Sequence, residues 1–482
     1  MMRALFRDTL IYGASAALSR GLSLIVLPIY TRILSPVDYG ALDMVLVIGS
    51  FAILLVALEI TQALARFYAD ADGPAAKRRM ASTALWFTLA AYTAASTAAF
   101  AAAEPLAAWL LGGPAMAGAL RIGLAGIAAN GLFYLAQSQL RFELRSGAYA
   151  AISLVYSFAM VGLGILLGWG LGLGLLGVLW GQFAGTAIAA ALGLYLLRSS
   201  YRFEFDGALL RSMLAFSLPL VPSALATFFT LNSNRLLLNG IQGLDAVGMF
   251  GVAARVGGAI TLLIVGLQSA LTPLVYAHFR EKETPGRLAR LTEQFTALAL
   301  GCCLGLGIFA WEILALFVEA RYRSAAPLVL FLAPATLLGQ MYVFFPGIAI
   351  AKRTHLQLYI FAATAFVSVG LNWLLIGAIG LVGAAVATLL SSLVFIGLWA
   401  WTSQRLYPLP LSWSRIASGF VLFAAAAAAA VLLQASGLRL AWLIAAKSAV
   451  LLLFLAGTVA CGLLRPADLA RLGRLMVGRS AA

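Results

Sequence analysis

Residues 356–402 read LQLYIFAATAFVSVGLNWLLIGAIGLVGAAVATLLSSLVFIGLWAWT, and they include no charged side chain. The hydrocarbon core of a bilayer is about 30 Å thick and is crossed by about 20 residues of α-helix. This stretch is therefore too long for a single crossing. The glycine-rich segment near its middle divides it, and the sequence predicts two consecutive transmembrane helices, at 356–376 and 381–402.

The rest of the chain follows the same pattern. Of the 482 residues, 63% are hydrophobic and 10% are charged, and the mean hydropathy is +0.99. This composition excludes a water-soluble globular domain. We expect an all-α integral membrane protein with about fourteen transmembrane helices. The apolar runs place them at 9–30, 41–64, 80–102, 118–138, 148–168, 172–197, 213–231, 246–276, 291–317, 326–350, 356–376, 381–402, 413–434 and 441–464.

The formal net charge of +15 raises the question of a nucleic-acid partner. The basic residues lie in short connections between apolar helices and form no continuous patch, so we expect no nucleic-acid binding. Of the 32 Lys and Arg residues, 23 fall on one side of the predicted membrane, six on the other and three inside helices. The positive-inside rule then predicts a multi-pass membrane protein with both termini in the cytoplasm.

The chain contains an internal repeat. Residues 161–201 align without a gap with 367–407, and Thr31-Arg32 followed by Asp38-Tyr39-Gly40 is similar to Asn234-Arg235 followed by Ala246-Val247-Gly248. Each repeat holds six predicted helices, so the two halves are parallel and related by an axis along the membrane normal. The aligned pairs are Gly164 with Gly370, Gly174 with Gly380, Gly177 with Gly383 and Tyr201 with Tyr407.

This repeat predicts the domain organisation. We expect an N-terminal six-helix bundle at 1–200, a second six-helix bundle at 201–405, and an additional helix pair with a basic cytoplasmic tail at 406–482. Two parallel bundles predict a central cavity between them. Small residues at Gly177, Gly181 and Gly185 indicate close helix packing rather than chemistry.

Several short motifs occur in a characteristic order and spacing along the chain: Tyr12-Gly13-Ala14-Ser15 through Pro28, Arg32 to Gly40, Leu140 to Arg145, Ala351 to Thr354, and Asn372 followed by Gly380 to Ala385. Together they resemble the Wzx-type polysaccharide biosynthesis transporters of the multidrug/oligosaccharidyl-lipid/polysaccharide exporter superfamily. The resemblance implies a flippase of the bacterial inner membrane that moves an undecaprenyl-diphosphate-linked repeat unit of O-antigen, capsule or exopolysaccharide from the cytoplasmic to the periplasmic leaflet by alternating access. It also implies a lipid-linked oligosaccharide substrate, and polymerase or glycosyltransferase partners.

Lipid II flippases of the same superfamily usually carry an Asp-Ala-Phe signature in the first helix and an Asn-x-x-Arg turn after it. The corresponding stretches here are Leu18-Ser19-Arg20-Gly21-Leu22 and Pro28-Ile29-Tyr30-Thr31-Arg32. This departure favours a polysaccharide carrier over a peptidoglycan-precursor carrier.

Charged residues within the predicted helices are the candidate binding residues. Arg20 lies near the middle of the first helix and Arg255 lies nine residues into the eighth, depths at which a charge is costly unless it meets water or an anion. We expect both guanidinium groups to bind the diphosphate in the central cavity. An ion pair of Arg20 with Glu59, or a side chain that snorkels to the interface, is the structural alternative. Arg66 is a candidate at the cytoplasmic mouth, where a solvated charge or a lipid contact fits equally.

Acidic residues provide candidates for a coupling ion. Glu59, Asp43 and Glu312 lie inside or near the ends of predicted spans, and each fits either a proton or sodium site or a charge pair. Lys447 either lines a lipid groove beside the bundle or pairs locally. Asn130, Gln137, Gln182, Asn232, Asn234 and Asn372 are candidates for binding sugar hydroxyls, with hydrogen bonding between helices as the more frequent use of such residues.

Other functions remain as alternatives. A drug or cation antiporter of the same superfamily would share the fold but should favour acidic residues in its cavity. A glycosyltransferase or glycan polymerase would need acid–base chemistry on the outer face. The longest outer loop, 103–117, has Glu104 as its only acidic residue and no histidine. We therefore expect no enzyme activity and no catalytic residue. The cysteines, Cys302, Cys303 and Cys461, have no metal-ligand spacing, so we expect no metal or cofactor, with coupling to a proton or sodium gradient left open.

Overall fold

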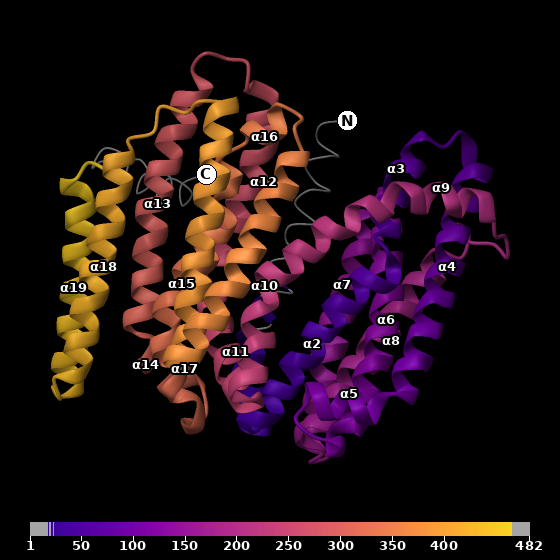
Figure 1. Ribbon diagram of the computed structural model, residues 1–482, viewed down its shortest axis with the longest axis horizontal. Helices are drawn as coiled ribbons and strands as arrows, with labels where there is room; N and C mark the ends of the chain where they lie inside the picture. Colours follow the sequence, from indigo (N-terminus) through magenta and orange to yellow (C-terminus); the bar gives the residue numbers. More distant parts are fainter. Residues whose placement is uncertain (1–17, 19–20, 23, 465–482) are drawn as a thin grey trace, which may run out of the picture. The chain divides into compact units, whose positions relative to one another are not determined.

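The computed structural model describes residues 18, 21–22 and 24–464, and its regular elements are helical throughout this part of the chain (Figure 1). An apolar helix at Leu24–Ile33 precedes the labelled elements. These are α2 (Pro36–Ala57), α3 (Ile60–Asp70), α4 (Gly73–Ala101), α5 (Ala103–Leu110), α6 (Ala117–Phe142), α7 (Ser146–Ile165), α8 (Gly174–Leu196), α9 (Gly207–Ser217), α10 (Val221–Gln242), α11 (Leu244–Gly258), α12 (Thr261–His278), α13 (Thr284–Ile308), α14 (Ala310–Phe317), α15 (Ala326–Gln340), α16 (Gly347–Ile350), α17 (His355–Leu406), α18 (Trp413–Ala435) and α19 (Leu440–Ala460), joined by short 3₁₀ and π turns.

The predicted membrane class is confirmed. Twelve helical elements among the described residues are long and apolar enough to cross a bilayer. One of them, α17, has 52 residues and contains the non-helical pair Ile379 and Gly380, so it comprises the two spans predicted at 356–376 and 381–402. The first predicted helix, 9–30, lies mostly outside the described residues, and the total of fourteen stays a prediction.

The chain folds into two compact units. The first contains the described residues up to Val252 together with Phe361–Ala384, and the second contains Ala253–Ile360 and the described residues from Ala385 onward. In the first unit α6, α7 and α8 pack side by side, and α4 lies along α6 (Figure 1). In the second unit the pair α18 and α19 packs against α13. The predicted division at residues 200 and 405 stays a prediction.

A capping box fixes the start of α2. The Ser35 hydroxyl accepts a hydrogen bond from the Asp38 backbone amide at 3.1 Å, and the Asp38 carboxylate accepts one from the Ser35 backbone amide at 3.2 Å. Pro36 occupies the first helical position, where its missing amide costs nothing. The Ser-Pro-Val-Asp motif therefore has a local structural role.

The predicted single helix at 41–64 is wrong. Leu58 and Glu59 adopt left-handed backbone conformations, with φ of 48° and 55°, and separate α2 from α3. Two adjacent non-glycine residues in this region cost about 1–3 kcal/mol each. Hydropathy alone gives no sign of such a break, because both sides of it are apolar enough to continue the helix.

Two other predicted boundaries also move. α4 begins at Gly73 instead of residue 80, because Lys77, Arg78 and Arg79 extend the helix beyond its apolar part. α10 runs to Gln242, whereas the predicted helix ended at 231 and left Arg235 in an outer connection. Asn232 and Arg235, in the last turns of α10, both form side-chain hydrogen bonds. These polar residues are therefore satisfied within the helix and do not end it.

The repeat-equivalent glycines share the same local conformation. Gly174 and Gly380 both have positive φ, at 55° and 63°. Gly177 and Gly383 are the next aligned glycines after Gly174 and Gly380. A methyl group on either would lie within 2.5 Å of the backbone of the preceding helix. Gly181 and Gly185 meet α7 in the same way, as the small-residue spacing predicts.

Candidate functional site

The starts of α2 and α11 meet in a reciprocal glycine contact. A methyl group added at Gly40 would lie 1.9 Å from the Leu244 carbonyl oxygen, and one at Gly248 would lie 2.0 Å from the Pro36 carbonyl oxygen. Each glycine thus packs on the backbone four residues before the other. Gly40 and Gly248 are equivalent in the predicted repeat, so the contact has the symmetry expected of a local two-fold axis.

An ion pair lies beside this contact. The Arg235 Nε of α10 donates to the Asp43 Oδ2 of α2 at 2.6 Å, and the Arg235 guanidinium lies 5.4 Å from the centre of the Phe250 ring. Asp43 is 8% exposed and Arg235 21%. Asp43 was predicted as a coupling-ion or charge-pair candidate, and the structure gives it a cationic partner.

The ion pair does not follow the local symmetry. Gly248 lies 208 positions after Gly40, and the same shift places Gly251 opposite Asp43. Gly251 has no carboxylate, and a methyl group at this position would approach Asp43 to 3.1 Å. The contact is therefore symmetric in its backbone and asymmetric in its charge.

A polar cavity of about 180 Å³ lies farther along α2, inside the first unit. Ser50 contributes from α2, Asn130 from α6, Tyr156 from α7, and Gln182 and Thr186 from α8. The two hydroxyls of Ser50 and Thr186 bond to carbonyls of their own helices. The amides of Asn130 and Gln182 make no hydrogen bond to any described residue, so they are available to water or to a hydroxylated ligand.

The other amide candidates have structural partners. Gln137 donates to Ser153 at 2.9 Å and Asn232 donates to the carbonyl of Phe228 at 3.1 Å. Asn372 joins Ser233 and Ser368 in a buried cluster between α10 and α17. Of the six predicted residues, Asn130 and Gln182 line this cavity.

A second buried ion pair lies in the second unit. The Lys447 Nζ of α19 donates to the Glu312 Oε1 of α14 at 2.6 Å, and Lys447 is only 1% exposed. The other carboxylate oxygen of Glu312 is buried and has no hydrogen-bond partner in the described part of the chain. Of the two roles that the sequence left open for Lys447, the structure supports local pairing.

The predicted diphosphate ligands are not brought together by the described residues. Arg20 lies outside them, so its proposed convergence with Arg255 and its pairing with Glu59 stay predictions. Arg255 is partly buried in the last turn of α11. Arg66 is exposed and forms an ion pair with Asp70. Glu59 is half-buried at the break after α2, and its carboxylate makes no hydrogen bond or ion pair with another described residue.

Arg235 is the residue that sequence reasoning missed. It was counted as an outer basic residue because the apolar run of α10 appeared to end at 231. The alignment of Asn234-Arg235 with Thr31-Arg32 at the end of a predicted helix was the available signal that Arg235 belongs to a helical position.

The sequence profile of the family described as polysaccharide biosynthesis protein matches residues 5–277, more than half of the 482 residues. The chain belongs to this family. The resemblance inferred from the short motifs is thereby confirmed at the level of the family. The match covers the helices that carry both the glycine contact and the ion pair, from α2 to α11.

Two curated relatives are similar over part of their length. The succinoglycan biosynthesis transport protein ExoT of Rhizobium meliloti is 25% identical over 327 residues, 65% of this chain and 62% of the relative. A probable low-salt glycan biosynthesis flippase of Haloferax volcanii is 26% identical over 270 residues, 53% of this chain and 55% of the relative. The matches thus span less than two thirds of either relative.

Solved structures share the fold. The lipid II flippase MurJ, in an inward closed conformation, has a TM-score of 0.66 at 13% identity and covers 92% of this chain and 98% of its own. An inward-facing multidrug resistance transporter of the MATE family and MOP superfamily has a TM-score of 0.63 at 17% identity, covering 80% and 94%. At these identities the likeness concerns the fold alone.

Proposed function

We propose that this protein is a flippase that translocates an undecaprenyl-diphosphate-linked polysaccharide repeat unit from the cytoplasmic to the periplasmic leaflet by alternating access. The observation that carries the proposal is the family match over 5–277, together with relatives named for glycan transport and glycan flipping. Transport, rather than catalysis, is the activity that we assign.

The geometry of the first unit supports a transport mechanism. The polar cavity with its two unbonded amides offers hydrogen bonds to hydroxyl groups within a membrane-spanning helix bundle. The glycine contact and the pair Asp43–Arg235 hold α2 against α10 and α11 at the ends that the positive-inside rule places in the periplasm. In our proposal this contact is the closed periplasmic gate, and it separates when the substrate leaves.

The gate must be able to open at moderate cost. A fully buried ion pair is costly to break, because each charge loses its partner without gaining water. Arg235 retains 21% exposure, so its guanidinium has a route to hydration when α10 moves away. Exposed ion pairs contribute only about 0–1 kcal/mol, so a hydrated Asp43–Arg235 pair would release readily.

The setting follows from the same proposal. We place the protein in the bacterial inner membrane with both termini in the cytoplasm. Its partners would be the lipid-linked oligosaccharide, membrane lipids, and a polysaccharide polymerase or glycosyltransferases. Coupling to a proton or sodium gradient is part of the proposal, and Glu59 is the acidic candidate without a described partner.

A drug or cation antiporter is the rival within the same fold. Such a protein needs an acidic group that is available to a cation. Of the three acidic candidates, Asp43 and Glu312 both have a basic partner at 2.6 Å, and Glu59 is left as the one without a partner among the described residues. This pairing favours the flippase over the antiporter.

Deletion of the gene in its own bacterium distinguishes the two functions. We expect loss of surface polysaccharide, accumulation of lipid-linked repeat units in the membrane, and unchanged tolerance of cationic dyes. Surface glycan is measured by gel and antibody staining, and tolerance by growth in ethidium. Increased dye sensitivity with normal surface glycan would contradict the proposal and support the antiporter.

A further inference from the structure

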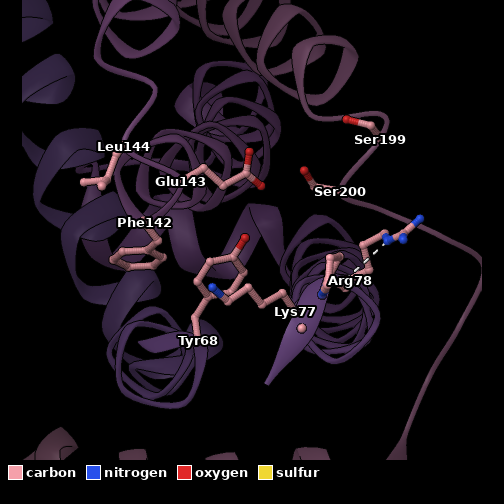
Figure 2. Close-up of a pocket in the computed structure, with 10 residues that line it drawn as sticks. Tyr68, Lys77, Arg78, Phe142, Glu143, Leu144, Ser199 and Ser200 are labelled. Carbon is pink, nitrogen blue, oxygen red and sulfur yellow. Dashed lines mark hydrogen bonds between the residues drawn. The ribbon is translucent and has the colours of Figure 1, made fainter. Parts of the chain in front are cut away.

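A pocket of about 690 Å³ lies at one end of the first unit, where three connections meet. Tyr68 lies near the end of α3, Lys77 and Arg78 lie in the first turns of α4, and Glu143 follows α6. Ser199 and Ser200 follow α8. Figure 2 shows these polar groups arranged around a common space, with the two serines and Arg78 on one side, Tyr68 and Glu143 on the other, and the Lys77 side chain reaching toward the Tyr68 ring.

The pocket holds two basic groups that have no acidic partner among the described residues. The Lys77 ammonium lies 5.3 Å from the centre of the Tyr68 ring, and the Arg78 Nε donates to the Pro74 carbonyl at 3.3 Å. Both side chains are partly buried. The terminal nitrogens of Arg78 and the ammonium of Lys77 therefore remain available to an anionic ligand.

The one carboxylate of the pocket is already engaged. Glu143 accepts a hydrogen bond from Gln139 Nε2 at 2.9 Å and lies 3.4 Å from Arg145 Nη1. Arg145 in turn donates to the Leu196 carbonyl at 2.9 Å, and it is not among the residues that line the pocket. Because Arg145 compensates Glu143, the charges of Lys77 and Arg78 are not cancelled, and the pocket attracts anions.

The opposite wall suits hydroxyl groups. The phenol of Tyr68 can donate a hydrogen bond, and burial, followed by a smaller effect of Glu143, raises its pKa further above neutral pH. Glu143, with 13% exposure, can accept one. A ligand with phosphate oxygens near Lys77 and Arg78 and hydroxyl groups near Tyr68 and Glu143 would form hydrogen bonds with both sets of residues.

The surroundings indicate the surface of a membrane. Leu144 beside the pocket is 73% exposed, and Phe203 in the connection after α8 is 95% exposed. Phe203 packs on Trp86, whose indole donates to the Arg202 carbonyl at 3.0 Å. Aromatic and basic side chains exposed together at helix ends are typical of the membrane interface. The positive-inside rule places this end of the unit on the cytoplasmic side.

We propose that this pocket binds a phosphate ester whose alcohol part carries free hydroxyl groups. Lys77 and Arg78 bind the phosphate oxygens, Ser199 and Ser200 donate further hydrogen bonds to them, and Tyr68 and Glu143 bind the hydroxyls. A phospholipid headgroup of the cytoplasmic leaflet and a soluble phosphate ester share this chemistry. The site is separate from the proposed gate and does not depend on the flippase function.

Binding is tested with the full-length protein in neutral detergent. Short-chain phosphatidylglycerol is the lipid probe and glycerol 3-phosphate the soluble probe, and the shift of the melting midpoint against ligand concentration gives the Kd. We expect saturable phosphatidylglycerol binding that weakens at least about tenfold in Lys77→Gln with Arg78→Gln, because two charge-assisted contacts are lost. Glu143→Gln should weaken phosphatidylglycerol binding more than binding of phosphatidic acid, which lacks the glycerol hydroxyls.

A matched control separates the site from bulk charge. Arg280→Gln with Lys282→Gln removes the same charge from exposed residues of another connection and should leave the Kd unchanged. The exchange Lys77→Arg with Arg78→Lys keeps the charge and should retain most of the binding. Competition by glycerol 3-phosphate would assign a soluble ligand, and its absence a lipid headgroup. Equal binding by wild type and the Gln double variant, or equal loss in the control pair, would overturn the proposal.

Discussion

Asp43–Arg235 and Glu312–Lys447, two buried ion pairs among the described residues, have the same length and different surroundings. Asp43–Arg235 in the first unit and Glu312–Lys447 in the second both measure 2.6 Å. Arg235 is 21% exposed and lies beside the reciprocal contact of Gly40 and Gly248, whereas Lys447 is 1% exposed on α19. The two pairs therefore differ in the exposure of the basic side chain and not in the distance between the charged atoms.

Exposure decides what each pair can do. Moving a charge out of water is costly, and a charge that cannot regain water stays bound to its partner. Arg235 can be hydrated in place, so its bond to Asp43 is suited to a gate that opens and closes. Lys447 has no such route, so its bond to Glu312 is suited to a permanent attachment of α19 to α14. A short buried ion pair is thus no measure of function by itself.

The largest effect is expected from breaking the permanent pair. Lys447→Ala leaves Glu312 buried with one oxygen already unpartnered, and should destabilise the protein by about 3–5 kcal/mol. The measurement is the melting midpoint and the folded yield in detergent.

The double variant Lys447→Met with Glu312→Gln is the control. It removes both charges and should recover most of the lost stability, because replacing a whole buried pair is often neutral. A double variant as unstable as Lys447→Ala would show that the loss comes from packing of the lysine stem and not from the uncompensated carboxylate.

The second prediction concerns the glycine contact. Gly40→Ala or Gly248→Ala places a methyl group about 2 Å from a backbone carbonyl oxygen, which no side-chain movement relieves. Each should cost about 1–3 kcal/mol or more and reduce transport strongly. Surface polysaccharide of complemented deletion cells measures transport, at matched protein levels.

Gly240→Ala is the matched control within α10, because a methyl group there meets no atom within 4 Å. Near wild-type stability and transport are expected for it. If Gly40→Ala behaved like Gly240→Ala, the close approach of α2 and α11 would be absent from the functioning protein.

The third prediction tests whether the exposed pair acts as a gate. Asp43→Asn keeps the shape of the side chain but removes the charge that holds Arg235, so α2 and α11 should separate more often. Val247, next to the glycine contact, is fully buried. In a background without the three native cysteines, Val247→Cys should react several-fold faster with a membrane-impermeant maleimide when Asp43 is replaced.

Asp245→Cys, at an exposed position two residues before Val247, should react equally in both backgrounds. Slow labelling of Val247→Cys in both backgrounds would show that Asp43–Arg235 is a permanent attachment like Glu312–Lys447. The proposed difference between the two ion pairs would then be wrong. Faster labelling at both positions would indicate general unfolding instead of gating.

The sequence was sufficient for the membrane fold, because transmembrane helices are set by apolar runs that hydropathy measures directly. It also predicted the equivalence of Gly40 and Gly248, since glycine is required wherever two backbones approach this closely. It could not predict the break at Leu58 and Glu59, because a left-handed pair of ordinary residues leaves no compositional signal.

The candidate site was predictable only in part. Asp43 and Glu312 were recognised as unusual because acids are costly at membrane depth. Their partners were not, since Arg235 lies 192 residues from Asp43 and Lys447 lies 135 from Glu312. Pairing over such separations depends on how helices pack, which periodicity within one helix does not reveal. The pocket around Lys77 and Arg78 was missed for the same reason, because its walls come from three connections.

The smallest effect is expected for two tyrosines outside the membrane spans, which differ in whether the hydroxyl has a hydrogen-bond partner. Tyr201 and Tyr407 are equivalent in the repeat, but the Tyr407 hydroxyl donates to the Phe279 carbonyl at 3.0 Å, whereas the buried Tyr201 hydroxyl has no hydrogen-bond partner among the described residues. Tyr201→Phe should therefore stabilise the protein slightly, by about 1 kcal/mol or less, and Tyr407→Phe should destabilise it by a similar amount.

The pH dependence sharpens this last test. Burial, with a smaller contribution from Glu143, raises the pKa of Tyr201 in the folded protein. Below the ordinary tyrosine pKa of about 10, both folded and unfolded chains keep the proton, and the stability is independent of pH. Above it the unfolded chain releases the proton while the folded chain does not, so stability falls as pH rises. Tyr201→Phe lacks this loss, and its advantage in melting midpoint should widen between pH 9 and about 11. An advantage that stays constant over this range would mean that Tyr201 ionises equally in both states and that its hydroxyl is hydrated in the folded protein.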